Sequence, residues 1–125
     1  MKSLPIILVV LLVAVFFMQK NSGSYKQISQ DEAKQMMDKG NVIILDVREK
    51  DEYDAGHIKG AVLLPVGTIN ADTAAKVIDS KDSTVLVYCR SGNRSKKASS
   101  ALAKLGYKNI HEFGGITTWK YDVEY

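Results

Sequence analysis

Two short runs of consecutive aliphatic residues constrain the fold of this chain more than any other feature. Residues 42–45 read VIIL and residues 84–88 read TVLVY, with no charge inside either run. A strand with one face in water alternates apolar and polar residues, whereas an unbroken apolar run is typical of a strand covered on both faces. Both faces are covered in parallel sheets, because the connecting helices pack on them. We therefore expect two central strands of a mainly parallel sheet.

Helical patterns lie on either side of these runs. In residues 94–105 apolar side chains recur at helical spacing, and Gly106 follows as a stop signal. Another helix is expected between the capping residue Ser29 and Gly40, and a third at residues 72–78. Shorter strands are expected at residues 25–28, 61–64 and 109–113. Strands that alternate with helices predict an α/β domain of three layers.

The N-terminus differs in composition from the rest of the chain. Residues 4–18 are free of charge, and Lys2 and Lys20 flank them. A helix of this length would span about 22 Å, short of the hydrocarbon core of about 30 Å, but a bilayer can thin around a short span. We expect residues 1–24 to form a membrane anchor and linker, and residues 25–125 a single domain outside the cytoplasm. The alternative is a signal segment that is cleaved on export.

Composition excludes several kinds of protein. The chain has one cysteine and two histidines, so it has neither an internal disulfide nor a cysteine-cluster metal site, and we expect no metal and no cofactor. Apart from Lys2 and Lys20, 15 basic residues face 14 acidic ones, as counted from the 17 basic residues of the full sequence. This near balance, without a basic stripe, argues against a nucleic-acid partner.

The segment Cys89-Arg90-Ser91-Gly92-Asn93-Arg94 is the strongest candidate site. It joins the second central strand to the clearest helix, and ligands of open α/β sheets bind at the carboxyl ends of strands. Gly92 can adopt a positive φ, so the loop can turn its amides inward as an anion-binding nest, with Arg90 and Arg94 adding positive charge. Such a nest lowers the pKa of a thiol and makes Cys89 a candidate nucleophile. Taken alone, a cysteine at the end of a strand is more often a small core residue. The flanking arginines and Gly92 favour the nucleophile instead.

This loop resembles the active-site loop of single-domain rhodaneses, a family of sulfurtransferases with the pattern Cys-Arg-x-Gly-x-Arg/Thr. Further segments resemble the upstream and C-terminal signatures of the same family, and the resemblance runs from Tyr25 to about Tyr121. These segments are Asp46-Val47-Arg48-Glu49, Glu52-Tyr53, Gly56-His57-Ile58-Lys59-Gly60-Ala61, Leu64-Pro65, and Gly114-Gly115 with Trp119.

The resemblance implies a sulfur relay. Cys89 would take the outer sulfur of a small anionic donor such as thiosulfate and pass it, as a persulfide, to a thiol or another thiophilic acceptor. Arg90 would face the substrate, and Arg94 would lie nearer the closing end of the loop. The substrate would then lie against the residues Arg90, Ser91, Gly92, Asn93 and Arg94.

Two other functions stay open at this stage. One is a binding or sulfur-carrier module that has the fold but negligible turnover. The other is a cysteine-dependent phosphatase. Phosphatases of that kind space Cys and Arg by five residues, whereas four residues separate Cys89 from Arg94, and the shorter ring disfavours a phosphate.

Other polar residues are interpreted as structural. Asp46 and Arg48 follow a central strand and are expected to support the loops through hydrogen bonds and an ion pair. His57 belongs to a turn, and His111 to a short strand. Trp119 is expected to close the core through a last helix. Lys96, Lys97 and Lys104 are expected to form a solvated helix face.

Overall fold

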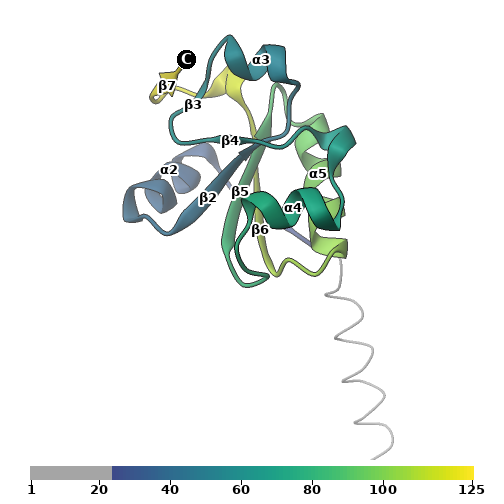
Figure 1. Cartoon of the computed structure of the whole chain (residues 1–125). Helices are drawn as coiled ribbons and strands as arrows, with labels where there is room; N and C mark the ends of the chain where they lie inside the picture. Colours follow the sequence, from purple (N-terminus) through teal and green to yellow (C-terminus); the bar gives the residue numbers. More distant parts are fainter. Residues whose placement is uncertain (1–23) are drawn as a thin grey trace, which may run out of the picture.

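A five-stranded parallel sheet forms the centre of the domain (Figure 1). The computed structural model describes residues 24–125. The strands follow the order β1-β6-β5-β2-β4, and each neighbouring pair is parallel. Their bounds are Lys26–Gln27 for β1, Val42–Asp46 for β2, Val62–Leu63 for β4, Thr84–Cys89 for β5 and Asn109–Gly115 for β6.

The two aliphatic runs became β2 and β5, and they pair with each other inside the sheet. Their side chains alternate between two apolar clusters, one on each face of the sheet. In β5, Val85 and Val87 belong to one cluster, and Leu86 and Tyr88 belong to the other. The unbroken apolar runs are thus explained by burial on both faces.

Helices cover both faces, which makes three layers and confirms the predicted α/β class (Figure 1). On one face lie α4 (Ala71–Val77) and α5 (Asn93–Lys104). The other face is covered by α2 (Gln30–Lys39). Ser29 caps α2 by accepting a hydrogen bond from the amide of Glu32 at 3.0 Å, and Gly40 ends it with a φ of 85°.

Several short elements have no counterpart in the sequence prediction. They are α3 (Lys50–Asp54), the antiparallel pair of β3 (His57–Ile58) and β7 (Val123–Glu124), and the 3-10 turns η1 (Val66–Thr68) and η2 (Ile116–Thr118). The prediction of a last helix carrying Trp119 is wrong, because only the three-residue turn η2 precedes it. Trp119 is half-buried and packs its ring against Phe113, with 5.6 Å between ring centroids.

Within residues 24–125, no helix is both long enough and apolar enough to cross a membrane. The predicted hydrophobic segment at residues 4–18 lies outside the described residues.

Candidate active site

Cys89 is the last residue of β5, at the carboxyl edge of the sheet. The chain then turns through Arg90 and Ser91 to Gly92, the N-terminal cap of α5, where φ is 111°. A positive φ was the conformation expected for Gly92. It strains residues that have a β-carbon, but not glycine. The loop therefore brings the first amides of α5 back over the sulfur of Cys89.

The sulfur of Cys89 lies among hydrogen-bond donors. The amide of Gly92 donates to Sγ at 3.0 Å, and the hydroxyl oxygen of Ser95 lies 3.4 Å from Sγ. Burial raises the pKa of the Cys89 thiol, but hydrogen bonds from the Ser95 hydroxyl and from the amides of Ser95, Gly92 and Ser91 outweigh it. The net effect lowers the pKa below that of a free cysteine, the direction expected from the loop.

The outer side of the loop is held by the turn that follows β6. The carbonyl oxygen of Arg90 accepts hydrogen bonds from the amide of Thr117 at 3.2 Å and from its hydroxyl at 3.0 Å. Gly115 lies directly against the peptide bond that joins Arg90 to Ser91. The path of the loop is therefore fixed from outside as well as by the helix that it begins.

The two arginines of the loop have different surroundings. Arg94 makes a two-pronged ion pair with Glu52 of α3, at 2.6 and 2.9 Å, while Arg90 is exposed. The hydrogen bond from Arg94 lowers the pKa of Glu52 to about 2. Within residues 24–125 no carboxylate pairs with Arg90. The resemblance implied that Arg90 faces the substrate and that Arg94 lies nearer the closing end of the loop. Of these two arginines, Arg94 is paired with Glu52, and Arg90 has no carboxylate partner within the described residues.

A cavity of about 290 Å³ opens beside the loop. Its lining combines Arg90 with the turn after β6 and with the segment around α3. These residues are Arg48, Glu52, Ala55, Gly56, Arg90, Ile116 and Thr117. The cavity gives a small anion a place next to the unpaired guanidinium of Arg90. Ser91 and Asn93 are exposed at the rim of the loop.

Asp46 and Arg48 form a buried ion pair, with 2.7 Å between Arg48 Nη2 and Asp46 Oδ2. Arg48 also donates to the carbonyl of Gly56 at 2.7 Å, and the hydroxyl of Tyr88 donates to Asp46 at 2.6 Å. The same Tyr88 hydroxyl accepts from the amide of Ile58 at 3.0 Å. These contacts join the end of β2 to β3 and β5.

Both histidines lie apart from the sulfur's hydrogen bonds. The ring of His57 stacks on Tyr53, with centroids 3.7 Å apart, and its Nδ1 lies 2.9 Å from the Tyr53 carbonyl oxygen. Burial, followed by the charge of Lys26, lowers the pKa of His111. Lys96, Lys97 and Lys104 are exposed along α5.

Two buried polar residues at the site were missed by sequence reasoning. Ser95 lies one residue beyond the segment from Cys89 to Arg94, and Glu112 lies in the strand predicted at residues 109–113. The Ser95 hydroxyl oxygen is 2.6 Å from Glu112 Oε2. Glu112 could have been identified from its place in the predicted strand, because it lies between the apolar residues Ile110 and Phe113, which are both buried.

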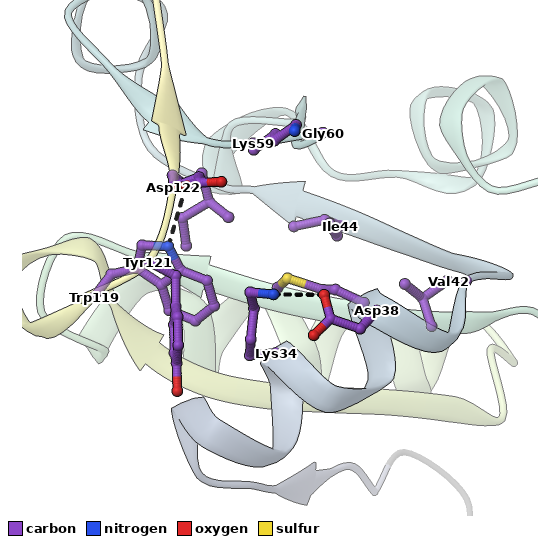
Figure 2. Close-up of a pocket in the computed structure, with 12 residues that line it drawn as sticks. Lys34, Asp38, Val42, Ile44, Lys59, Gly60, Trp119, Tyr121 and Asp122 are labelled. Carbon is purple, nitrogen blue, oxygen red and sulfur yellow. Dashed lines mark hydrogen bonds and ion pairs between the residues drawn. The ribbon is translucent and has the colours of Figure 1, made fainter.

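A larger cavity, of about 550 Å³, lies elsewhere, between α2, β2 and the C-terminal segment (Figure 2). Trp119 and Tyr121 form one wall, and Lys34 and Asp38 of α2 form another. No residue of the Cys89 loop lines it. Its size is therefore no guide to the chemistry of Cys89.

Comparisons with known proteins agree on one family. The model of the rhodanese-like domain matches residues 29–122. A protein of Schizosaccharomyces pombe is 41% identical over 87 residues, which make up 60% of each protein, so the chain spans less than two thirds of that relative. The thiosulfate sulfurtransferase GlpE of Coxiella burnetii is 36% identical over 97 residues, 77% of this chain and 88% of that protein.

A solved structure is similar as well. The structure described as rhodanese with anions from E. coli is 28% identical, with a TM-score of 0.62. The match covers 66% of this chain and 96% of that one.

Proposed function

The chain belongs to the rhodanese-like domain family, and from this premise we propose that it is a sulfurtransferase that works through a persulfide on Cys89. The observation that carries the proposal is the ring of donors around the sulfur. Gly92, Ser91 and Ser95 favour the thiolate, which is the reactive form of cysteine. The name of the similar Coxiella burnetii protein supports thiosulfate as a donor.

The first step is attack by the Cys89 thiolate on the outer sulfur of the donor. With thiosulfate, a bond forms between Sγ and that sulfur, the bond between the two thiosulfate sulfurs breaks, and sulfite leaves with the electron pair. The persulfide carries the same negative charge as the thiolate did. The amides that stabilise the thiolate are therefore placed to stabilise the persulfide also.

The second step returns the enzyme to its starting form. A thiophilic acceptor, which is cyanide in an assay and a thiol in the cell, attacks the outer persulfide sulfur and leaves Cys89 as a thiolate. Donor and acceptor react in turn at one sulfur, so the kinetics are of the ping-pong type. Arg90, at the lining of the adjacent cavity, attracts the anionic donor.

One observation favours a non-catalytic module of the same fold. Cys89 is only 1% exposed, so its side chain offers almost no surface to a donor. A protein in which the sulfur stays covered would bind partners without turning over sulfur. The phosphatase alternative lacks such support, because Glu52 already neutralises the Arg94 guanidinium that would hold a phosphate.

Thiocyanate formation from thiosulfate and cyanide decides between an enzyme and a non-catalytic module. We expect steady turnover with the full chain and none with Cys89→Ser, which keeps the size of the side chain but not the thiolate. Turnover of an aryl phosphate faster than that of thiosulfate would instead support the phosphatase. Absence of turnover with either substrate would support the non-catalytic module.

We further propose that residues 4–18 attach the domain to the cell membrane, with the domain outside the cytoplasm. The support is the uncharged apolar sequence itself and the short polar linker that follows it. The alternative is export after cleavage of a signal. Sequencing the N-terminus of the mature protein separates the two, because a chain that starts near Tyr25 has lost the apolar segment.

A further inference from the structure

Ser95 and Glu112 are buried polar residues that contact each other, and the proposed function gives Glu112 no role. Ser95 is fully buried at the third position of α5, and Glu112 is 3% exposed in β6. Alternate residues of a strand face the same side, and Ile110 of β6 packs in the same apolar cluster as Ala98 of α5. Glu112 therefore faces α5 and the loop that precedes it.

The two side chains form a continuous row with Cys89. Ser95 Oγ lies 3.4 Å from Cys89 Sγ on one side and 2.6 Å from Glu112 Oε2 on the other. Ser95 Oγ is also 2.9 Å from the carbonyl oxygen of Gly92 and 3.4 Å from that of Gly114. The amide of Gly114 donates to Glu112 Oε2 at 2.8 Å.

A serine hydroxyl has one hydrogen but can also accept, so Ser95 can serve the two ends of the row in either of two ways. With a thiol at one end and a carboxylate at the other, Ser95 donates to Glu112 and accepts from Cys89. With a thiolate and a carboxylic acid, every bond reverses, and Ser95 donates to the sulfur. The row thus holds one proton that either end can carry.

The surroundings favour movement of the negative charge to the sulfur. Within residues 24–125 no lysine, arginine or histidine forms an ion pair with Glu112. A buried carboxylate without a cation is costly, whereas the sulfur is surrounded by the amides of Ser91, Gly92 and Ser95.

The charged groups on the neighbouring elements form ion pairs or act on groups other than Glu112, and the charge of Cys89 acts on Arg94. Arg94 of α5 pairs with Glu52 of α3, and Arg48 pairs with Asp46 at the end of β2. Lys26 of β1 is exposed, and its charge lowers the pKa of His111. His111 precedes Glu112 in β6 and therefore faces the opposite side of the sheet.

We propose that Glu112 takes the proton of Cys89 through the hydroxyl of Ser95. The S–H bond of Cys89 and the O–H bond of Ser95 break, and new O–H bonds form on Ser95 and Glu112, so the net charge of the row does not change. The inference deepens the proposed function, on which it rests, since it supplies the thiolate for sulfur transfer. Ser95 touches the reacting sulfur, and Glu112 is a positioning residue that acts through it.

Infrared spectroscopy of the full chain at neutral pH tests where the proton lies. We expect the carbonyl stretch of a protonated carboxylic acid in the native protein, and its absence in Glu112→Gln. Alkylation of Cys89 with iodoacetamide removes the thiolate that accepts from Ser95, so the frequency of the same band should shift as the hydrogen bonds of the row change. If the native protein reacts as a thiolate but shows no acid band, Glu112 does not hold the proton and the proposal is wrong.

The pH dependence of alkylation tests the link through Ser95. Ser95→Ala should move the midpoint of the alkylation rate to higher pH. A midpoint that rises by about 1 in pH slows the reaction about tenfold at pH values below both midpoints. Ser99→Ala is a matched control, because Ser99 is equally buried in α5 and its hydroxyl has no hydrogen-bond partner within residues 24–125. Equal midpoints in the two variants would overturn the proposal.

These readouts are independent of sulfur transfer. If the acid band and the higher midpoint of Ser95→Ala are found without thiocyanate formation, the relay stands and the proposed function fails. If Cys89-dependent turnover is found without the acid band, the proposed function stands and the relay fails.

Discussion

Gly115 lies so close to Arg90 that a β-carbon at position 115 would be 1.9 Å from the Arg90 carbonyl oxygen. It would also be 2.6 Å from the amide nitrogen of Ser91. Both neighbours are backbone atoms that cannot swing aside as a side chain can. The glycine is thus required for the path of the loop around Cys89, although φ at Gly115 is that of an extended strand.

Gly115→Ala should therefore displace the loop. We expect a loss of stability of about 1–3 kcal/mol, typical of overpacking, and a larger loss of sulfur transfer, because the displaced amides no longer meet the sulfur. Gly67→Ala is the control, since a β-carbon at position 67 meets nothing within 4 Å. Urea unfolding measures the loss of stability, and thiocyanate formation measures the loss of sulfur transfer. Equal behaviour of both variants would show that the contact of Gly115 with the backbone of Arg90 and Ser91 does not fix the loop.

Arg90→Gln should weaken binding of an anionic donor. The Arg90 guanidinium is exposed beside the cavity and has no ion-pair partner within the described residues, so its charge acts on the donor. In the variant we expect KM for thiosulfate to rise roughly tenfold, with little change in kcat. Lys96→Gln removes an exposed charge from α5 and serves as control. Steady-state kinetics at low salt would show the difference, and an equal rise in both variants would mean that net charge alone attracts the donor.

Glu52→Gln should cost stability at neutral pH but not in strong acid. The pKa of Glu52 is lowered from 4.5 to about 2 in the folded protein. Its ion pair with Arg94 therefore contributes fully to stability above about pH 4.5, and this contribution is lost as the pH falls toward 2. We expect a deficit of about 1 kcal/mol at neutral pH, reduced by salt.

The control for Glu52→Gln is Asp54→Asn, which removes the exposed ion pair of the same helix with Lys50. Urea unfolding across this pH range provides the comparison. A deficit in Glu52→Gln that stays constant down to pH values near 2 would show that the ion pair is not its cause.

Tyr88→Phe should destabilise the domain by about 2 kcal/mol, the typical cost of unsatisfied buried polar groups. The Tyr88 hydroxyl is the hydrogen-bond partner of both the Asp46 carboxylate and the Ile58 amide, and both would lose it. Tyr107→Phe is the control, since no hydrogen bond of the Tyr107 hydroxyl is found in residues 24–125. The difference in the free energy of unfolding between the variants measures what the hydrogen bonds of the Tyr88 hydroxyl contribute to stability. If the two variants are equally stable, the buried network does not stabilise the domain.

The central part of the fold was predictable because its signals are local. The apolar runs at β2 and β5 and the pattern of α5 each follow from periodicity within one segment. The helix α3 has only five residues and buries none of them, so it has no apolar face to detect. The pairing of β3 with β7 joins residues 57–58 to 123–124, and two-residue strands show no period.

The site was predictable only where its residues follow one another in sequence. The loop from Cys89 to Arg94 is continuous, and Gly92 has the positive φ that was expected. The contacts that complete the site come from distant segments: Glu52 neutralises Arg94, and Glu112 meets Ser95 from β6. Such pairings depend on strand order, which residue spacing along the chain does not contain.

The mass of the intact protein after treatment with thiosulfate tests the central claim most directly. Since the chain has one cysteine, the site of any stable sulfur adduct is unambiguous. We predict a gain of one sulfur atom that cyanide removes as thiocyanate and that Cys89→Ser does not show. An unchanged mass of the native protein, with Cys89 still open to alkylation, would contradict the account.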